Sequence, residues 1–168
     1  MVETNRLRLI PLTYDQLIKY GRVDYSLERE LGLQEISRSI SSDLLEPLEQ
    51  TILMNVANPN KNYLYSTLWI MILKTENKIV GDLCFKGEPN SEGEIEIGYG
   101  TYENFRNEGY MTEAVSGIIN WAVVQPGIKS IIAETEKSNL ASFRILEKNN
   151  FKKYRETEFM FWWKLSLI

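Results

Sequence analysis

Polar and apolar residues alternate over two stretches of the chain, and each alternation predicts a β-strand. Residues 6–12 alternate up to Pro11, and because proline cannot donate a hydrogen bond to a neighbouring strand, the pattern is typical of an edge strand. Residues 94–99 alternate strictly and predict a central strand. Apolar runs at residues 68–74 and 79–86, joined by a polar turn, predict a hairpin.

The first half of the chain also contains a helical period. Thr13 is the predicted N-cap of a short helix over residues 14–20. Between residues 22 and 55 the apolar residues recur at helical intervals, while Ser41–Asp43 and Pro47 interrupt the pattern. Two helices are therefore predicted in this region.

The second half predicts two further helices and three strands. An amphipathic helix runs from Gly109 to Gln125, and another from Asn139 to Lys148 ends in Asn149–Asn150, a plausible left-handed C-cap. An apolar strand at residues 128–135 separates these helices, and two strands close the chain within residues 151–165. This order of elements predicts one α/β (α+β) domain with a mixed sheet over residues 1–168.

The composition excludes several kinds of chemistry. The chain contains no histidine, so it has no Ser-His or Cys-His nucleophile pair and no histidine-ligated metal. Its single cysteine, Cys84, cannot form an internal disulfide or a structural zinc site, which fits a reducing compartment.

The charge balance and the chain ends bear on partners and location. Lys and Arg number 19 against 23 Asp and Glu, a formal net charge of −4, which disfavours nucleic acid and slightly favours a cationic or amine substrate. No apolar secretory segment follows Glu3, and the longest charge-free stretch, residues 114–128, is too short to span a membrane. We expect a cytoplasmic protein with no metal, nucleic-acid partner or membrane partner.

The segment Arg106–Met111 is the first candidate for chemistry. It lies between a predicted strand and a long helix, whose first N–H groups have no partner within the helix. Gly109 removes a side chain where an anion would approach, and Arg106 adds a positive charge. An ordinary strand-to-helix turn with a solvated arginine fits the same spacing equally well. Other phosphate-binding patterns are missing, because Gly98-Tyr99-Gly100 lacks the third glycine of a dinucleotide fingerprint and no P-loop sequence occurs.

The segment Asn139–Phe151 is the second candidate. Asn139 is most simply an N-cap, and Ser142, one turn later, shares its helix face.

In their order and context, the two segments resemble the GNAT superfamily of N-acetyltransferases. Arg106–Met111 matches the family's [Q/R]-x-x-G-x-[G/A] acetyl-CoA pyrophosphate loop except at the last position. Further similarity is to the RimJ/RimL-like branch, the ribosomal-protein N-terminal acetyltransferases and their relatives. That similarity lies in Glu3–Leu9, Glu96–Tyr99, Gly109–Ala114 and Asn139–Phe151.

The resemblance implies a mostly antiparallel, twisted sheet flanked by helices, and acetyl-CoA as cosubstrate. It implies that the strand at residues 96–99 splays from its neighbour and offers main-chain groups to the pantetheine arm. The residues it assigns to acetyl-CoA binding are Ile97, Gly98, Tyr99, Arg106, Asn107, Glu108, Gly109, Tyr110, Met111, Thr112, Asn139 and Ser142. In this family a free amine attacks the thioester directly, so no protein nucleophile is required.

The resemblance also suggests catalytic roles. Glu96 occupies the position of a carboxylate base in several family members, and strand alternation places it on one face with Glu92, Glu94 and Gly98. A solvated acidic face is the alternative reading of that alternation. Leu146 stands where many members carry a tyrosine that protonates the leaving thiolate, so Ser142 is the candidate donor. Tyr63, Tyr99 and Glu158 are lesser candidates.

Two other departures from the family pattern matter. Met111 replaces glycine or alanine and is expected to crowd the loop, and Asn150 replaces a glycine, which asparagine's tolerance of left-handed geometry permits. Adjacent Trp162 and Trp163 must face opposite ways, so one is expected to pack inward and the other to cover a homodimer or substrate surface.

Together these observations predict transfer of acetyl from acetyl-CoA to a primary amine, most simply a protein N-terminal α-amine. A small amine such as a polyamine or aminoglycoside is an alternative acceptor. A catalytically silent CoA-binding regulatory module is the alternative from another class, since Leu146 and Met111 depart from the pattern. The segment between Tyr20 and Ser66, where relatives build specificity, carries no diagnostic motif.

Overall fold

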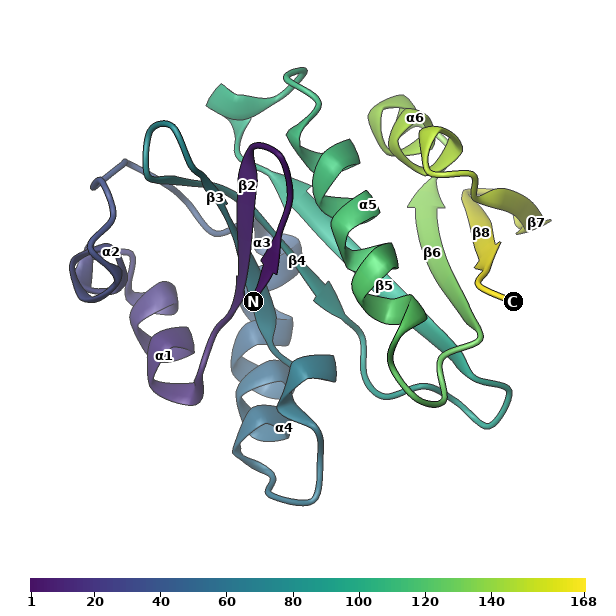
Figure 1. Cartoon of the computed structure of the whole chain (residues 1–168), viewed down its shortest axis with the longest axis horizontal. Coiled ribbons are helices and arrows are strands. Elements are labelled where there is room, and N and C mark those ends of the chain that lie inside the picture. Colours follow the sequence, from purple (N-terminus) through teal and green to yellow (C-terminus); the bar gives the residue numbers. More distant parts are fainter.

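One twisted sheet of eight strands runs through the molecule in the computed structural model, which describes residues 1–168 (Figure 1). The strand order is β1-β2-β3-β4-β5-β6-β8-β7. All neighbours are antiparallel except β5 and β6, which are parallel. The strands are β1 (Val2–Glu3), β2 (Leu7–Pro11), β3 (Leu68–Leu73), β4 (Lys78–Phe85), β5 (Glu94–Thr101), β6 (Ser130–Glu136), β7 (Lys152–Glu156) and β8 (Met160–Ser166). The expected mixed, mostly antiparallel sheet is confirmed.

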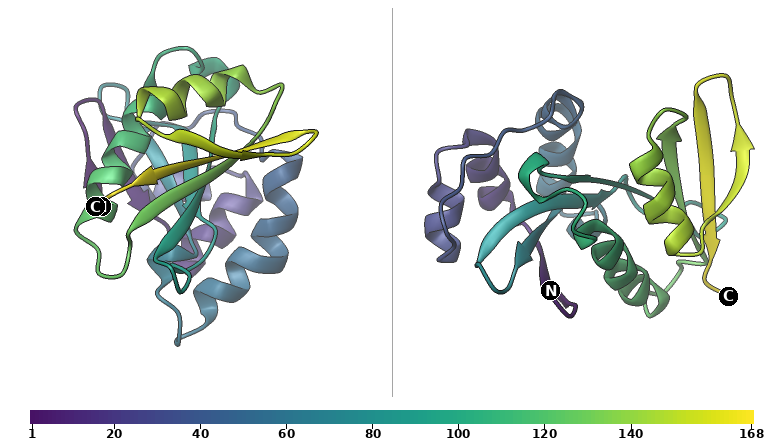
Figure 2. Two further views of the ribbon diagram at one scale, coloured as in Figure 1. Left: turned by 90° about the vertical axis from the view of Figure 1, so that its right-hand side faces the viewer. Right: turned by 90° about the horizontal axis from the view of Figure 1, so that it is seen from above.

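Helices cover both faces of this sheet (Figures 1 and 2). One face carries α1 (Tyr14–Arg22), α2 (Ser26–Leu31), α3 (Ser42–Pro47), the π-helical turn η1 (Leu48–Ile52) and α4 (Leu53–Ala57). The other carries α5 (Tyr110–Val123) and α6 (Leu140–Lys148). Two short 3₁₀ turns, η2 (Tyr63–Tyr65) and η3 (Glu103–Phe105), lie in connections. None of the helices combines the length and hydropathy that crossing a membrane requires.

The two helical layers enclose two separate hydrophobic cores. A cluster of 22 buried residues lies between the sheet and α5 and α6, and one of 11 lies on the α1–α4 side. Strand β3 contributes to both, since Trp69, Met71 and Leu73 belong to the larger cluster and Leu68, Ile70 and Ile72 to the smaller. A strand covered on both faces reads as a continuous apolar run, which explains its sequence.

The N-terminal strand differs from the prediction. Residues 7–11 form β2, which is not an edge strand, because residues 2 and 3 fold back and pair with it as β1. Thr4 N–H donates to Leu7 C=O at 2.9 Å and closes this hairpin. A strand of two residues is too short to show an alternation of polar and apolar residues. The sequence therefore predicts β2 as the edge of the sheet, whereas the edge is β1.

The helices between residues 22 and 57 also differ from the prediction. Two helical stretches are present, as predicted, and Ser41, at the predicted interruption, is the N-cap of the second. The break is longer than predicted, because it begins at Gly32, which takes a φ of +65° and ends α2. Pro47, expected to interrupt a helix, lies inside a continuous one. Leu48 N–H still donates to Leu44 C=O and Leu45 C=O, and the π turn that follows widens the helix, with Leu53 N–H donating to Leu48 C=O. The apolar residues at helical spacing within residues 33–41 are therefore not helical.

Candidate active site

Strands β5 and β6 part in the middle of the sheet. Their pairing ends at Ile97 and Ala133, although β5 continues to Thr101 and β6 to Glu136. Lys86 N–H donates to Glu96 C=O and Tyr102 N–H to Val80 C=O, so the even-numbered residues of β5 bond to β4. The main-chain groups of Tyr99 and Thr101 therefore face the gap. This parting is the splay that the sequence resemblance implies.

A cleft of about 820 Å³ opens beside the parting, on the face covered by α3 and α4. The even positions of β5 face it, and because Gly98 and Gly100 occupy two of them, no side chain fills the space. Nothing lies within 4 Å of where a Gly100 Cβ would stand. The lining also includes Ser41, Asp43, Leu44, Pro47, Thr51, Ile52, Asn55, Ser66, Asp82, Cys84, Phe85, Lys86, Gly87, Ile97, Tyr99, Glu134, Thr135, Glu136, Asn139, Ser142 and Met160.

The loop before α5 has the geometry of an anion site. Asn107 and Gly109 take positive φ values of 65° and 78°, which turn the chain into the helix. The first main-chain bond of α5 runs from Glu113 N–H to Gly109 C=O at 3.1 Å, so the N–H groups of Tyr110, Met111 and Thr112 have no partner within the helix. Arg106 is exposed, and its Nε donates to Thr101 C=O at 3.4 Å, which ties the loop to the free end of β5.

Met111 does not crowd this loop, contrary to expectation. Its side chain is 3% exposed and belongs to the larger core cluster, so it points away from the free N–H groups. Asn150, in contrast, takes the expected left-handed conformation at a φ of 65°. Leu146 is fully buried in the same core and does not line the cleft.

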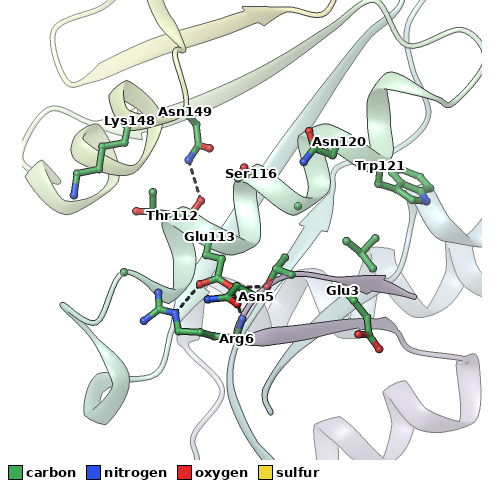
Figure 3. Close-up of a pocket in the computed structure, with 14 residues that line it drawn as sticks. Glu3, Asn5, Arg6, Thr112, Glu113, Ser116, Asn120, Trp121, Lys148 and Asn149 are labelled. Atoms are coloured by element: carbon green, nitrogen blue, oxygen red, sulfur yellow. Dashed lines mark hydrogen bonds and ion pairs between the residues drawn. The ribbon is translucent and has the colours of Figure 1, made fainter. Parts of the chain in front are cut away.

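An anchor that the sequence did not predict holds the loop from the other side (Figure 3). Glu113, in the first turn of α5, accepts hydrogen bonds from Thr4 Oγ1, Arg6 N and Arg6 Nε, each at 2.6 Å. Arg6 also donates through Nη1 to Glu108 C=O at 2.9 Å and stacks 4.7 Å from the Tyr110 ring centroid. Burial raises the pKa of the Glu113 carboxyl, but these hydrogen bonds outweigh it and leave the pKa below its ordinary value.

A second cavity of about 790 Å³ lies beside this anchor, between the β1–β2 hairpin, α5 and the end of α6 (Figure 3). Asn149 crosses from α6 and donates through Nδ2 to Thr112 C=O at 3.1 Å. The two contacts hold the start of α5 from both sides. The only sequence signal for the first of them is the family-like opening Glu3–Leu9, since Arg6 and Glu113 are 107 positions apart.

The start of α6 reaches the cleft from the opposite wall. Asn139 Oδ1 accepts a hydrogen bond from Ser142 N–H at 3.1 Å, which confirms its role as N-cap. Ser142 is half-buried and lines the cleft. Tyr99 donates through its hydroxyl to Ser142 C=O at 3.5 Å, and burial raises the pKa of Tyr99 to about 12, so the phenol stays protonated at neutral pH.

Glu96 lies on the cleft face of β5, and its carboxylate is paired with Lys86 at 2.5 Å. Lys86 lines the cleft, whereas Glu96 itself does not. Glu94 pairs instead with Lys164 at 2.6 Å. Tyr63 and Glu158 are exposed and do not line the cleft. Of the acidic and tyrosine candidates, the structure thus brings only Tyr99 directly into the cleft.

The two adjacent tryptophans face opposite ways, as expected. Trp163 is buried, and its Nε1 donates to Thr135 Oγ1 at 2.9 Å. Trp162 is half-buried, with Arg155 of β7 lying 4.7 Å over its ring.

Comparison with known proteins agrees with this geometry. The Acetyltransferase (GNAT) domain family matches residues 6–152. The uncharacterized N-acetyltransferase YjdG of Bacillus subtilis (strain 168) is 34% identical over 165 residues, which are 96% of each chain. The chain belongs to the GNAT acetyltransferase family. It is an acetyl-CoA-dependent N-acetyltransferase, as family and relative agree.

Solved structures share the fold at low sequence identity. A GNAT-family acetyltransferase from Bacillus anthracis superposes with a TM-score of 0.66 at 17% identity and covers 99% of this chain and 98% of its own. RimL, described as a ribosomal L7/L12 alpha-N-protein acetyltransferase in complex with coenzyme A, gives a TM-score of 0.68 at 14% identity, with 97% and 95% covered.

Proposed function

We propose that the protein binds acetyl-CoA across the parting of β5 and β6 and transfers its acetyl group to a protein N-terminal α-amine, as the RimJ/RimL-like branch does. The observation that carries the proposal is the continuity between two sets of unpaired main-chain groups. The free N–H groups of Tyr110, Met111 and Thr112 suit a pyrophosphate. The main chain of Tyr99 faces the gap in β5, to whose end Arg106 ties the same loop, and suits the amide groups of a pantetheine arm.

The choice of a protein N-terminus as acceptor is supported by structural neighbours. RimL is described as acting on a protein α-amine, and a Salmonella typhimurium acetyltransferase with a TM-score of 0.65 is described as modifying an N-terminal serine. The cleft has a volume of about 820 Å³, which is enough for the first residues of a peptide. A small amine such as a polyamine remains the second candidate acceptor.

The chemistry requires orientation, a proton acceptor and stabilisation of the developing oxyanion. Acetyl-CoA supplies the thioester carbon that the neutral amine attacks. Glu96 is the proposed base, acting through water beside Lys86, whose ammonium holds the carboxylate at the rim of the cleft. Ser142, at the opposite wall, is the proposed source of the proton for the thiolate. Both roles come from the family resemblance.

The test is CoA release measured with acetyl-CoA against a panel of N-terminal peptides, polyamines and aminoglycosides. We expect peptide acceptors to give the highest kcat/KM. A preference for polyamines would replace the proposed acceptor, and CoA binding without turnover of any amine would favour the regulatory module.

A further inference from the structure

A buried carboxyl group that the family resemblance does not use lies at the floor of the cleft. Asp82 of β4 is only 9% exposed and lines the cleft. Tyr20 of α1 donates to Asp82 Oδ2 at 2.8 Å, and the Tyr102 hydroxyl lies 3.0 Å from that of Tyr20. Since Tyr20 gives its proton to Asp82, Tyr102 is the donor of the second bond. Asp82 Oδ1 accepts no hydrogen bond from the chain.

A buried ion pair supports this network from behind. Arg38 donates through Nε to Glu28 Oε1 at 2.9 Å and through Nη1 to Tyr20 C=O at 3.0 Å, with its guanidinium 4.3 Å from the Tyr20 ring centroid. Arg38 makes no ion pair with Asp82, so the Asp82 carboxylate has no cationic partner of its own. A buried carboxylate without a cation is costly to keep, which marks the site as one that receives a charge from outside.

The register of the sheet places Asp82 next to the unpaired part of β5. Asp82 is directly opposite Gly100, and Cys84 is opposite Gly98. Both glycines lie beyond Ile97, where β6 has already parted from β5. Because neither glycine has a side chain, Asp82 is open to a ligand lying along this stretch of β5.

Two further features point to a polar, positively charged ligand. Four carboxylate side chains line the cleft, those of Asp43, Asp82, Glu134 and Glu136, against one cation, Lys86, which is already paired with Glu96. Ser66 also lines the cleft, is 4% exposed, and its hydroxyl has no hydrogen-bond partner in the chain. A buried hydroxyl without a partner is rare and is satisfied when a polar ligand arrives.

We propose that Asp82 docks the ammonium group of the acceptor and takes its first proton, with Tyr20 and Tyr102 as positioning residues. This inference rests on the proposed acetyl transfer. One N–H proton of the ammonium passes to the Asp82 carboxylate and leaves a neutral amine. The nitrogen then bonds to the acetyl carbon and gives its second proton to Glu96 through water. The carbon–sulfur bond breaks, and the thiolate takes a proton from Ser142, whose hydroxyl regains one through water. The proton held by Asp82 returns to solvent after the product leaves.

The electrostatics of the site fit this role. Burial raises the pKa of Asp82 from 3.8 to about 6, while the hydrogen bond from Tyr20 and the charge of Arg38 lower it. Asp82 is therefore ionised at pH 7, yet basic enough to accept a proton. The titratable groups that face it are Tyr20, Tyr102, Arg38 and Cys84, and Glu28 is the ion-pair partner of Arg38. Burial raises the pKa of both tyrosines and that of Cys84, so all three remain protonated across this range.

The test compares pH profiles of kcat/KM for wild type, Asp82→Asn and the exposed control Asp15→Asn, with CoA affinity measured alongside. Wild type and Asp15→Asn should gain activity as the pH rises through about 6, because Asp82 loses its proton there. Asp82→Asn should keep its CoA affinity, raise KM for the amine, lose about 100-fold in kcat/KM at pH 7, and lose the limb near pH 6.

Gly100→Val is a second variant that leaves Asp82 and its hydrogen bonds intact. The valine side chain enters open space opposite Asp82, so the fold and CoA affinity should persist while KM for the amine rises about tenfold or more. The inference would be overturned if Asp82→Asn kept the kcat/KM and the low-pH limb of wild type. It would also be overturned if Gly100→Val kept the wild-type KM. Either result would leave the proposed acetyl transfer intact. A wild-type protein that neither binds CoA nor acetylates any amine would overturn both.

Discussion

Arg6 and Glu113 join the first hairpin of the chain to the first turn of α5, with Arg6 Nε 2.6 Å from Glu113 Oε2. The same arginine holds Glu108 C=O and covers Tyr110, so one side chain contacts the loop on both sides of Gly109. The N-terminal residues therefore act as a brace for the anion-binding loop, in addition to starting the sheet.

Replacing Glu113 with alanine should weaken CoA binding about tenfold. The change removes three hydrogen bonds to a charged acceptor and frees Arg6 from the loop, at a cost of about 1 to 2 kcal/mol of folding stability at this partly exposed site. Titration of CoA by calorimetry measures the affinity. Glu30→Ala is the matched control, because Glu30 also accepts from two side chains, Lys19 and Gln16, far from the loop. Equal CoA affinities in the two variants would contradict the brace.

Gly109→Asp should abolish the thermal stabilisation that CoA gives to the protein, because it places a carboxylate where the pyrophosphate approaches. For wild type, CoA at about 100 times its Kd should add about 2.7 kcal/mol, a Tm rise of roughly 5 to 10 °C. Differential scanning fluorimetry in millimolar CoA measures the shift.

Alanine substitutions at Gly109 and Gly127 separate the effect of backbone strain from the effect of losing contact with CoA. Gly109 and Gly127 both take positive φ, at 78° and 87°, so Gly109→Ala and Gly127→Ala should each lose about 1 to 2 kcal/mol of stability. Only the change at Gly109 should also weaken CoA binding. A CoA-dependent Tm shift that survives in Gly109→Asp would refute the assignment of the loop.

Glu96→Gln should lower kcat by about 10²–10⁴, equivalent to roughly 3 to 5 kcal/mol of barrier, if Glu96 is the base. The deficit should shrink as the pH rises and neutral amine accumulates. Glu94→Gln is the control, two residues away on the same face and paired with Lys164. A change confined to KM would mean that Glu96 only attracts a cationic substrate. Full activity would mean that Glu96 is not the base, and that Asp82 alone accepts a proton from the amine.

Ser142→Ala should slow turnover by about tenfold, less than a lost general base, because a thiolate leaves readily. Ser142→Thr keeps the hydroxyl and should retain most of the activity. Steady-state kcat under saturating acetyl-CoA gives the comparison. If alanine is tolerated without loss, the serine serves only to begin α6, since its N–H is already bound by Asn139.

Asp82→Asn should make the protein more stable at pH 7 while making it less active. The folded-state pKa of Asp82, about 6, lies above its ordinary 3.8, so the carboxyl stabilises the fold fully below about pH 4, and this stabilisation is lost as the pH rises to 6. The full effect is at most about 3 kcal/mol, the free energy of a shift of that size. Urea unfolding of wild type and variant at pH 5 and pH 7 measures it. A wild-type stability that does not fall across this window relative to the variant would contradict the raised pKa.

The features that the sequence predicted correctly are those that depend on residues close together in the chain. The alternation in β5, the N-cap at Asn139 and the glycine before α5 follow from contacts within a few residues, and each is in its predicted place. The π turn after Pro47 was not predictable, because proline reads as a break unless the chain widens to accommodate it. The segment 33–41 carries apolar residues at helical spacing, yet it is not helical, because Gly32 ends α2 in the left-handed conformation and Arg38 is buried against Glu28 and the Tyr20 carbonyl.

The candidate site divides in the same way. The residues proposed to bind acetyl-CoA lie mainly in two continuous segments, Arg106–Met111 and Asn139–Phe151, so they can be recognised in the sequence. The acceptor half of the site joins Tyr20, Asp82 and Tyr102, which are up to 82 positions apart and gain meaning only when α1 packs on the sheet. Asp82 lies in an apolar strand, and the sequence does not single it out, since the pattern of a strand does not show which positions face a cleft.

The parting of β5 and β6 gives the sheet an internal edge, a row of unpaired main-chain groups inside the fold. Exposed edges invite pairing with other chains, and proteins limit the hazard by keeping them short. Here the edge is limited to Tyr99 and Thr101, and Arg106 already contacts the carbonyl of Thr101. This unpaired stretch of β5 is too short to pair stably with a strand of another protein molecule. It is long enough for the pantetheine arm of acetyl-CoA, which carries only a few amide groups. The brevity of this edge thus admits a ligand and protects the protein from aggregation through its own active site.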